Sequence, residues 1–126
     1  MRTIKFRVWN GEMTYIDDWY WYEENGVRSV EGGVAYGNHA IYDMMQSTGL
    51  KDKNGVEIYE GDVVKDEFGD IYKCEYLADY AAFALTRGNY VDFVGQILTE
   101  RTDYYRWKVI GNIYENPELI KEAADE

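Results

Sequence analysis

The sequence has one cysteine and one histidine among its 126 residues. With Cys74 alone, no intrachain disulfide can form, which fits a protein of the reducing cytosol. His39 lies in a glycine-rich stretch with no cysteine or serine beside it. A histidine-based catalytic triad or a zinc site is therefore not expected.

Long hydrophobic runs are also missing. No window approaches the ~18 apolar residues that a membrane span needs, and residues 1–6 contain no apolar signal core. These absences predict a soluble protein that is not exported, stays in the cytoplasm and does not contact a membrane.

Basic residues are scarce, with 13 Lys and Arg against 24 Asp and Glu, so the net charge is −11. The average field of such a chain repels DNA and RNA. The densest basic stretch, residues 101–108, contains Asp103 and follows Glu100. Direct nucleic-acid binding is therefore not expected, and the acidic balance is interpreted first as a means of solubility.

What the chain does have is apolar and aromatic material: 46% hydrophobic and 17% aromatic residues, with 13 Tyr against 4 Phe. This composition excludes intrinsic disorder for most of the length. A chain of this size suits one domain with at most a small appendage, and it can bury a real core without disulfides or metals.

Hydrophobic residues alternate with polar ones along much of the chain. Residues 4–9 place Ile4, Phe6 and Val8 on one face of a strand. Short strands broken by Gly and Asp every eight to twelve residues or so are typical of a small barrel or sandwich. The predicted fold is mainly β, a β-rich α+β protein. It has an N-terminal β-hairpin region over residues 1–38, and a small β-barrel with a short C-terminal helix over residues 39–126.

An aromatic segment follows the first strand. Residues 13–24 are predicted to be a strand, and Asn25 and Gly26 a tight turn that places Glu23 opposite Arg28. Trp19 and Trp21 would then share one face, and Tyr20 and Tyr22 the other. The candidate interaction surface comprises Tyr15, Trp19, Tyr20, Trp21 and Tyr22. The alternative is a hairpin buried on both sides within its own domain.

Other segments are less distinctive. Residues 31–38 resemble a glycine-rich connector, residues 39–47 fit a helix or a strand, and residues 90–98 also fit either. Residues 80–86 are predicted to be a strand. Asn116 and Pro117 form a helix start, with Asn as N-cap and Pro at the first helical position, and the helix should extend to about Ala123.

Several residues invite a chemical interpretation, but each has a structural one. Gly55 and Gly61 fit turns that need a positive φ, and Asp62 can bond backbone amides. Cys74 alternates with Tyr72 and Tyr76, which predicts a buried, unreactive thiol. The acids Asp62, Asp66, Glu67 and Asp70 lack the spacing of an EF-hand calcium loop and favour a solvated acidic loop. No catalytic residue, metal site or cofactor is predicted.

Three stretches together resemble a known family. Residues 45–64, from Met45 through the Gly61 and Asp62 turn, resemble the central signature of the YopX family. Residues 109–119 resemble its closing signature, and residues 4–9 its usual opening. The resemblance implies a phage or prophage origin, action in the bacterial cytoplasm and no assigned catalytic residues. The Gly61 turn followed by short strands is also similar to the opening of SH3-like barrels, an analogy of fold only.

The preferred functional hypothesis is a non-catalytic protein-binding module that contacts a host or phage protein, with self-association into a homo-oligomer as an option. A second hypothesis is an acidic mimic of nucleic acid that blocks a DNA-binding host protein. A third is an enzyme whose site the sequence does not reveal.

Overall fold

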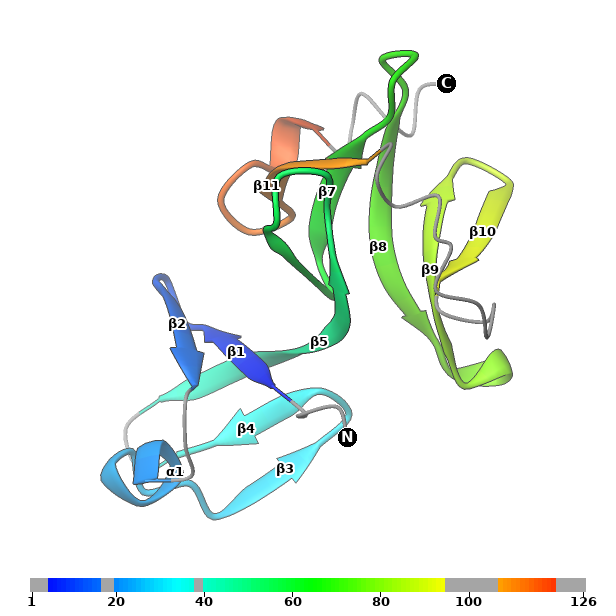
Figure 1. Ribbon diagram of the computed structural model, residues 1–126. Coiled ribbons are helices and arrows are strands. Elements are labelled where there is room, and N and C mark those ends of the chain that lie inside the picture. The colour runs from blue at the N-terminus through cyan, green and yellow to red at the C-terminus, as the bar shows by residue number, and fades with distance from the viewer. Residues whose placement is uncertain (1–4, 17–19, 38–39, 95–106, 120–126) are drawn as a thin grey trace. The chain divides into compact units, whose positions relative to one another are not determined.

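The computed structural model describes residues 5–16, 20–37, 40–94 and 107–119. The fold is mainly β, as predicted, with antiparallel sheets and short helical segments. The chain divides into two compact units, Met1–Ser47 and Thr48–Glu126, coloured from blue to cyan and from green to red in Figure 1. The boundary expected from the sequence fell after residue 38. The segment from residue 41 to 46 instead pairs with strands of the first unit.

The first unit contains β1 (Phe6–Trp9), β2 (Met13–Ile16), α1 (Tyr20–Glu24), β3 (Ser29–Glu31) and β4 (Val34–Tyr36), and β5 (Ile41–Lys51) begins in it. Its strands follow the order β2-β1-β5-β4-β3. The predicted first hairpin is confirmed, with Trp9 opposite Met13. Gly11 supplies the positive φ of its turn.

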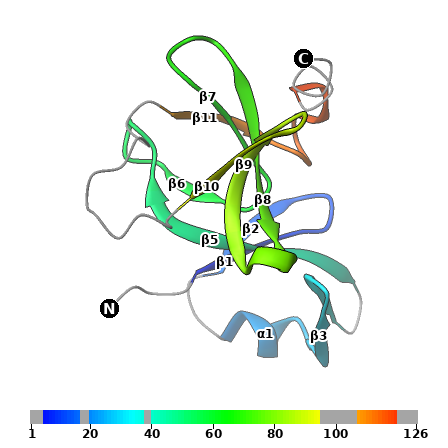
Figure 2. The same cartoon turned by 90° about the vertical axis from the view of Figure 1, so that its right-hand side faces the viewer.

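The predicted strand over residues 13–24 is wrong beyond Ile16, because Tyr20–Glu24 form the short helix α1, which leads into β3 (Figure 2). Asn25 and Gly26 end that helix instead of turning a hairpin. Gly26, with a φ of +60°, donates to the Glu23 carbonyl, and Val27 donates to the Tyr22 carbonyl. This pattern is a Schellman motif with glycine in its usual place. The expected pairing of Glu23 with Arg28 is therefore wrong too.

The glycine-rich stretch is a hairpin and not a connector. Gly32 and Gly33 both have a positive φ, +56° and +78°, as the tight turn of a two-residue hairpin requires. Glu31 and Val34 pair directly across it. The ambiguous segment after it is the strand β5, and His39 lies outside the described residues.

In the part of the second unit that the structure describes, six strands and a 3-10 turn follow the end of β5. These are β6 (Glu57–Tyr59), β7 (Asp62–Lys65), β8 (Ile71–Leu77), the 3-10 turn η1 (Ala78–Tyr80), β9 (Ala82–Arg87), β10 (Tyr90–Val94) and β11 (Lys108–Asn112). β6 pairs with β5, and the remaining strands form a sheet of order β10-β9-β8-β7-β11. Figure 1 shows β8 at the centre of that sheet. Among the described strands no sheet closes into a barrel, so the SH3-like barrel stays a prediction.

Both faces of β7 are buried. Val64 joins a cluster with Ile58, Tyr72 and Leu85 on one face. Val63 joins Ile71 on the other, against which Leu119 packs. Leu50 packs against the same cluster as Ile58 and Val64. Adjacent strand residues point to opposite faces, so burial of both valines means that this part of the sheet is covered on both sides.

The chain turns into its C-terminal helix after β11. Residues 117–119 are helical, so the predicted helix start is confirmed; residues 120–126 lie outside the described part. The Asn116 side chain accepts a hydrogen bond from the Asn112 amide at 3.2 Å. Asn112 Oδ1 in turn accepts from the amides of Tyr114 and Glu115. The two asparagines therefore fix the path of the chain between strand and helix.

The thiol of Cys74 is buried in the larger core cluster, with 1% of its surface exposed. We expect a thiol reagent to label the native protein slowly and the denatured protein much faster, because a buried thiol is inaccessible to the reagent. Absorbance of the released thiol anion measures both rates. Equal rates in native buffer and in denaturant would contradict the burial.

Candidate functional site

The turn between β7 and β8 is held in shape by its own first residue. Asp66 Oδ1 accepts hydrogen bonds from the backbone amides of Phe68 and Asp70, both at 2.9 Å. The Asp66 amide also donates to the Asp70 carbonyl at 2.9 Å. Gly69 supplies a φ of +89°. This bonding fixes Phe68 at the tip of the turn, where 78% of its surface is exposed.

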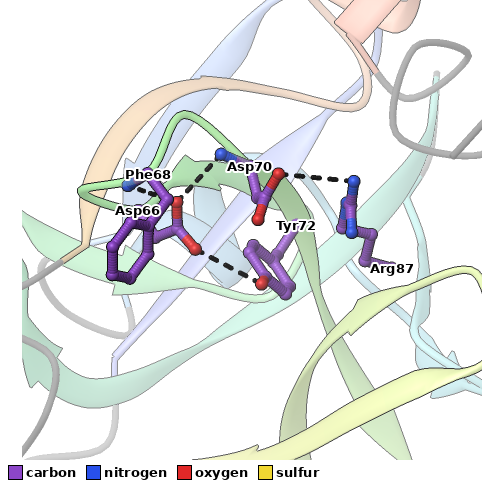
Figure 3. A network of polar contacts seen from close by, with 5 residues as sticks. All are labelled: Asp66, Phe68, Asp70, Tyr72 and Arg87. Carbon is purple, nitrogen blue, oxygen red and sulfur yellow. Dashed lines mark hydrogen bonds and ion pairs between the residues drawn. The ribbon is translucent and has the colours of Figure 1, made fainter.

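The same turn connects to the sheet through two further contacts (Figure 3). The Tyr72 hydroxyl donates to Asp66 Oδ2 at 3.3 Å. Arg87, on β9, forms an ion pair with Asp70 at 3.3 Å. A partly exposed ion pair contributes little stability, so its effect is mainly to orient the Asp70 carboxylate beside β8.

A cavity of 210 Å³ opens next to this turn. Its lining residues are Asp66, Glu67, Phe68, Asp70, Tyr72, Tyr90 and Trp107. The ring of Tyr72 meets that of Trp107 edge to face, with centroids 4.5 Å apart, and that of Tyr90 at 5.6 Å. The lining therefore combines aromatic surfaces with three carboxylates, and both carry negative potential.

The pKa of Tyr72 is raised to about 12, first by burial and then by the negative charges of Asp66 and Asp70. Because this value lies above the ordinary 10.0, ionisation of Tyr72 opposes folding. The contribution of the un-ionised Tyr72 side chain to the free energy of unfolding is fully present below about pH 10 and is lost as the pH rises toward about 12.

We therefore expect the denaturant midpoint of the wild type to decrease as the pH rises from about 10 to about 12, and part of this decrease to disappear in Tyr72→Phe. The matched control is Tyr76→Phe, which alters an exposed tyrosine of the same strand. Identical pH profiles for wild type and Tyr72→Phe would show that Tyr72 does not titrate in this way.

Trp107 is the innermost residue of the lining, with 4% of its surface exposed. Its indole Nε1 is buried, and within the described part of the chain it has no hydrogen-bond partner. Buried donors are rarely left unpaired in proteins. The described residues therefore do not supply the acceptor that this nitrogen would be expected to have.

The aromatic residues of the predicted interaction surface do not lie together on one strand. Tyr15 on β2 is exposed, and the Arg7 guanidinium lies 5.9 Å from its ring centroid. Tyr20 on α1 is also exposed. Trp21 packs edge to face on Tyr42, with centroids 4.9 Å apart, and on Tyr22. Trp19 lies outside the described residues. Because Tyr20, Trp21 and Tyr22 lie on a helix, these three side chains do not alternate between two faces as they would on a strand.

The acids weighed as a calcium site do not act as one group. Asp62 is buried, and its Oδ2 accepts from the Tyr59 amide at 2.7 Å, whereas Asp66 and Asp70 belong to the next turn. Across the described ranges, no three His, Cys, Asp or Glu side chains come close enough to share a metal ion. Within the same described residues, no helix is long and apolar enough to cross a membrane.

Sequence reasoning missed the aromatic part of this site. The acids of the turn were noted, but Phe68, Tyr90 and Trp107 were not connected with them. The one local signal was an apolar residue at the tip of an acidic turn, in the stretch Asp66-Glu67-Phe68-Gly69-Asp70.

Comparison with known proteins gives a family and a related structure. A model of the YopX protein family matches residues 5–121, nearly the whole chain. The chain is also similar to the crystal structure of protein EF1440 from Enterococcus faecalis, with a TM-score of 0.57 and 28% sequence identity. That match covers 95% of this chain and 99% of that one. No curated protein matches. Together with the signatures noted in the sequence, the family match establishes that this chain belongs to the YopX family.

Proposed function

We propose that this YopX-family chain is a phage- or prophage-encoded protein-binding module that acts by contact, without catalysis, in the bacterial cytoplasm. The observation that carries the proposal is Phe68, held 78% exposed on a turn that Asp66 shapes. Aromatic residues are enriched at protein interfaces, and an exposed ring on a preorganised turn loses little freedom on binding. The phage origin and the cytoplasmic location rest on the family alone.

A binding role also agrees with what the buried acids do. Asp62 accepts a backbone hydrogen bond beside its own turn, and Asp52 accepts three such bonds. Carboxylates engaged in this way serve the fold. The thiol of Cys74 lies in the core. These observations support a non-catalytic chain over the third hypothesis, an enzyme.

The test is site-specific photo-crosslinking in the bacterial host. A benzophenone amino acid replaces Phe68 in one variant and Tyr80 in another, because Tyr80 is an exposed aromatic residue of the same unit outside the cavity lining. We expect a discrete adduct with one host or phage protein at position 68 and none at position 80. The same adducts at both positions, or none at position 68, would refute this binding surface.

The acidic-mimic hypothesis is a second candidate, favoured by the net charge of −11. It predicts a different result for the crosslinking experiment. The crosslinked partner would be a DNA-binding host protein, and double-stranded DNA would displace this chain from it in a salt-dependent way. A partner unaffected by DNA would exclude the mimic.

Self-association through the aromatic segment is a separate proposal. Trp21 packs on Tyr42, so changing it to Ser would also disturb the fold. Changing the exposed Tyr15 and Tyr20 to Ser is the cleaner test. Light scattering should show an oligomer for the wild type and a folded monomer for the double variant. A monomeric wild type would refute self-association.

A further inference from the structure

The cavity beside the β7–β8 turn has the parts of a site for an organic cation. The ring of Tyr72 contacts the rings of both Tyr90 and Trp107 edge to face. All three rings line the cavity. A cation placed within about 6 Å of the face of such a ring is attracted by the ring quadrupole, and more strongly where water is excluded. Phe68 adds an exposed ring at the rim.

Charge complementarity indicates the sign of the occupant. Asp66, Glu67 and Asp70 all contribute to the lining, and Asp70 is partly neutralised by Arg87 at 3.3 Å. One carboxylate oxygen of Asp66 accepts hydrogen bonds from two backbone amides, and the other accepts one from the Tyr72 hydroxyl. These bonds hold its charge in place without neutralising it. An anionic ligand would face these carboxylates, whereas a cation would be stabilised by them.

The proposed function is protein binding, so the cation is expected to be part of a partner chain. Lysine and arginine are the protein side chains that carry a positive charge at neutral pH. Trp107 lines the cavity, so its indole N–H resonance reports on an occupant.

From these observations we propose that the cavity lined by Asp66, Glu67, Tyr72, Tyr90 and Trp107 binds a lysine or arginine side chain of the partner protein. The inference rests on the proposed binding function and names the chemistry that the partner must present. A neutral partner surface, or an acidic one, would not be recognised here.

The direct experiment uses the full isotope-labelled chain and four short acetylated, amidated peptides that differ at one central residue. That residue is arginine, lysine, citrulline or glutamine. Citrulline has the shape of arginine without its charge. We expect the arginine and lysine peptides to shift the amide resonances of Phe68 and Asp70 and the indole N–H resonance of Trp107. Their dissociation constants should be on the order of 1 mM, as befits a single anchoring side chain. The citrulline and glutamine peptides should bind at least about tenfold more weakly.

Variants at the lining then locate the effect. Tyr90→Ala removes one aromatic wall and should weaken binding of the arginine peptide about fivefold, a typical cation–π contribution. Glu67→Gln should weaken it about threefold and reduce its dependence on salt. The matched controls are Tyr80→Ala and Asp79→Asn, which alter an exposed aromatic and an exposed acid outside the cavity. Both should leave binding unchanged, and the dispersion of the amide spectrum confirms that each variant folds.

Two results would overturn the inference: equal affinity for the arginine and citrulline peptides, or no shift at these residues with any peptide at about 20 mM. The crosslinking experiment separates this failure from that of the proposed function. An adduct at position 68 without peptide binding would leave a protein-binding module that recognises something other than a cation. Peptide binding without an adduct would keep the cation site and refute the partner protein.

Discussion

Replacing Asp52 by alanine is expected to lower the free energy of unfolding by about 3–5 kcal/mol, because several hydrogen bonds to one buried charged acceptor are lost together. Asp52 Oδ1 accepts from the amides of Asn54 and Val56, at 2.8 and 2.9 Å. Asp52 Oδ2 accepts from the amide of Val109 at 2.8 Å. The carboxylate therefore ties the turn before β6 to β11.

Thermal unfolding followed by circular dichroism measures the loss, which corresponds to a fall of about 10 °C or more for a domain of this size. Asp52→Asn keeps one acceptor oxygen and should lose less than Asp52→Ala. Asp79→Asn, at an exposed position, should stay within about 0.5 kcal/mol of the wild type. A loss below about 1 kcal/mol for Asp52→Ala would show that the three bonds do not stabilise the fold.

Gly111→Ala is expected to cost about 1–3 kcal/mol, the usual range for inserting a methyl group where there is no room. A Cβ on Gly111 would collide with the Asn116 side chain, whose Oδ1 and Cγ are its nearest neighbours. Asn116 would have to move, and its hydrogen bond from the Asn112 amide would be lost. Denaturant unfolding measures the change in stability.

A double-mutant cycle tests the cause. Asn116→Gly removes the colliding side chain, and glycine at a helix N-cap is only slightly worse than asparagine. If the collision is the reason, Gly111→Ala should cost almost nothing when Asn116 is already glycine. Additive losses in the double variant would mean that Gly111 is needed for something other than this contact.

Much of the second unit could be predicted because its turns depend on local chemistry. Gly55 and Gly61 have the positive φ values, +81° and +89°, that their turns implied. Asp62 bonds a backbone amide as expected. The alternation of Cys74 with Tyr72 and Tyr76 correctly indicated a buried position for Cys74. In these cases the residue type and its immediate neighbours were sufficient.

The first unit shows where local chemistry is ambiguous. A glycine after asparagine supplies a positive φ, and both a hairpin turn and a helix C-terminus need one. For Asn25 and Gly26 the helix is favoured by tertiary contacts. The Asn25 side chain donates to the Trp21 carbonyl and accepts from the Tyr42 hydroxyl. Tyr42 comes from β5, so the deciding interaction could not be read from the segment itself.

The cavity could not have been found by inspecting one segment. Its acids lie between β7 and β8, Tyr90 begins β10, and Trp107 precedes β11. They meet because the sheet order β10-β9-β8-β7-β11 places the last strand beside β7 instead of beside β10. The strand order depends on pairing between distant residues, which a single sequence does not specify.

The hydrogen bond between Asp52 and Val109 also has a consequence for how the chain is made. The two residues are 57 positions apart. A ribosome that adds about 5–20 residues per second therefore takes roughly 3–11 seconds to synthesise Val109 after Asp52. During that interval the Asp52 carboxylate lacks one of its three backbone partners, and β7 lacks its neighbour β11. A nascent chain stalled or truncated before β11 would expose the β7 edge to other chains, so β11 completes this part of the sheet during biosynthesis.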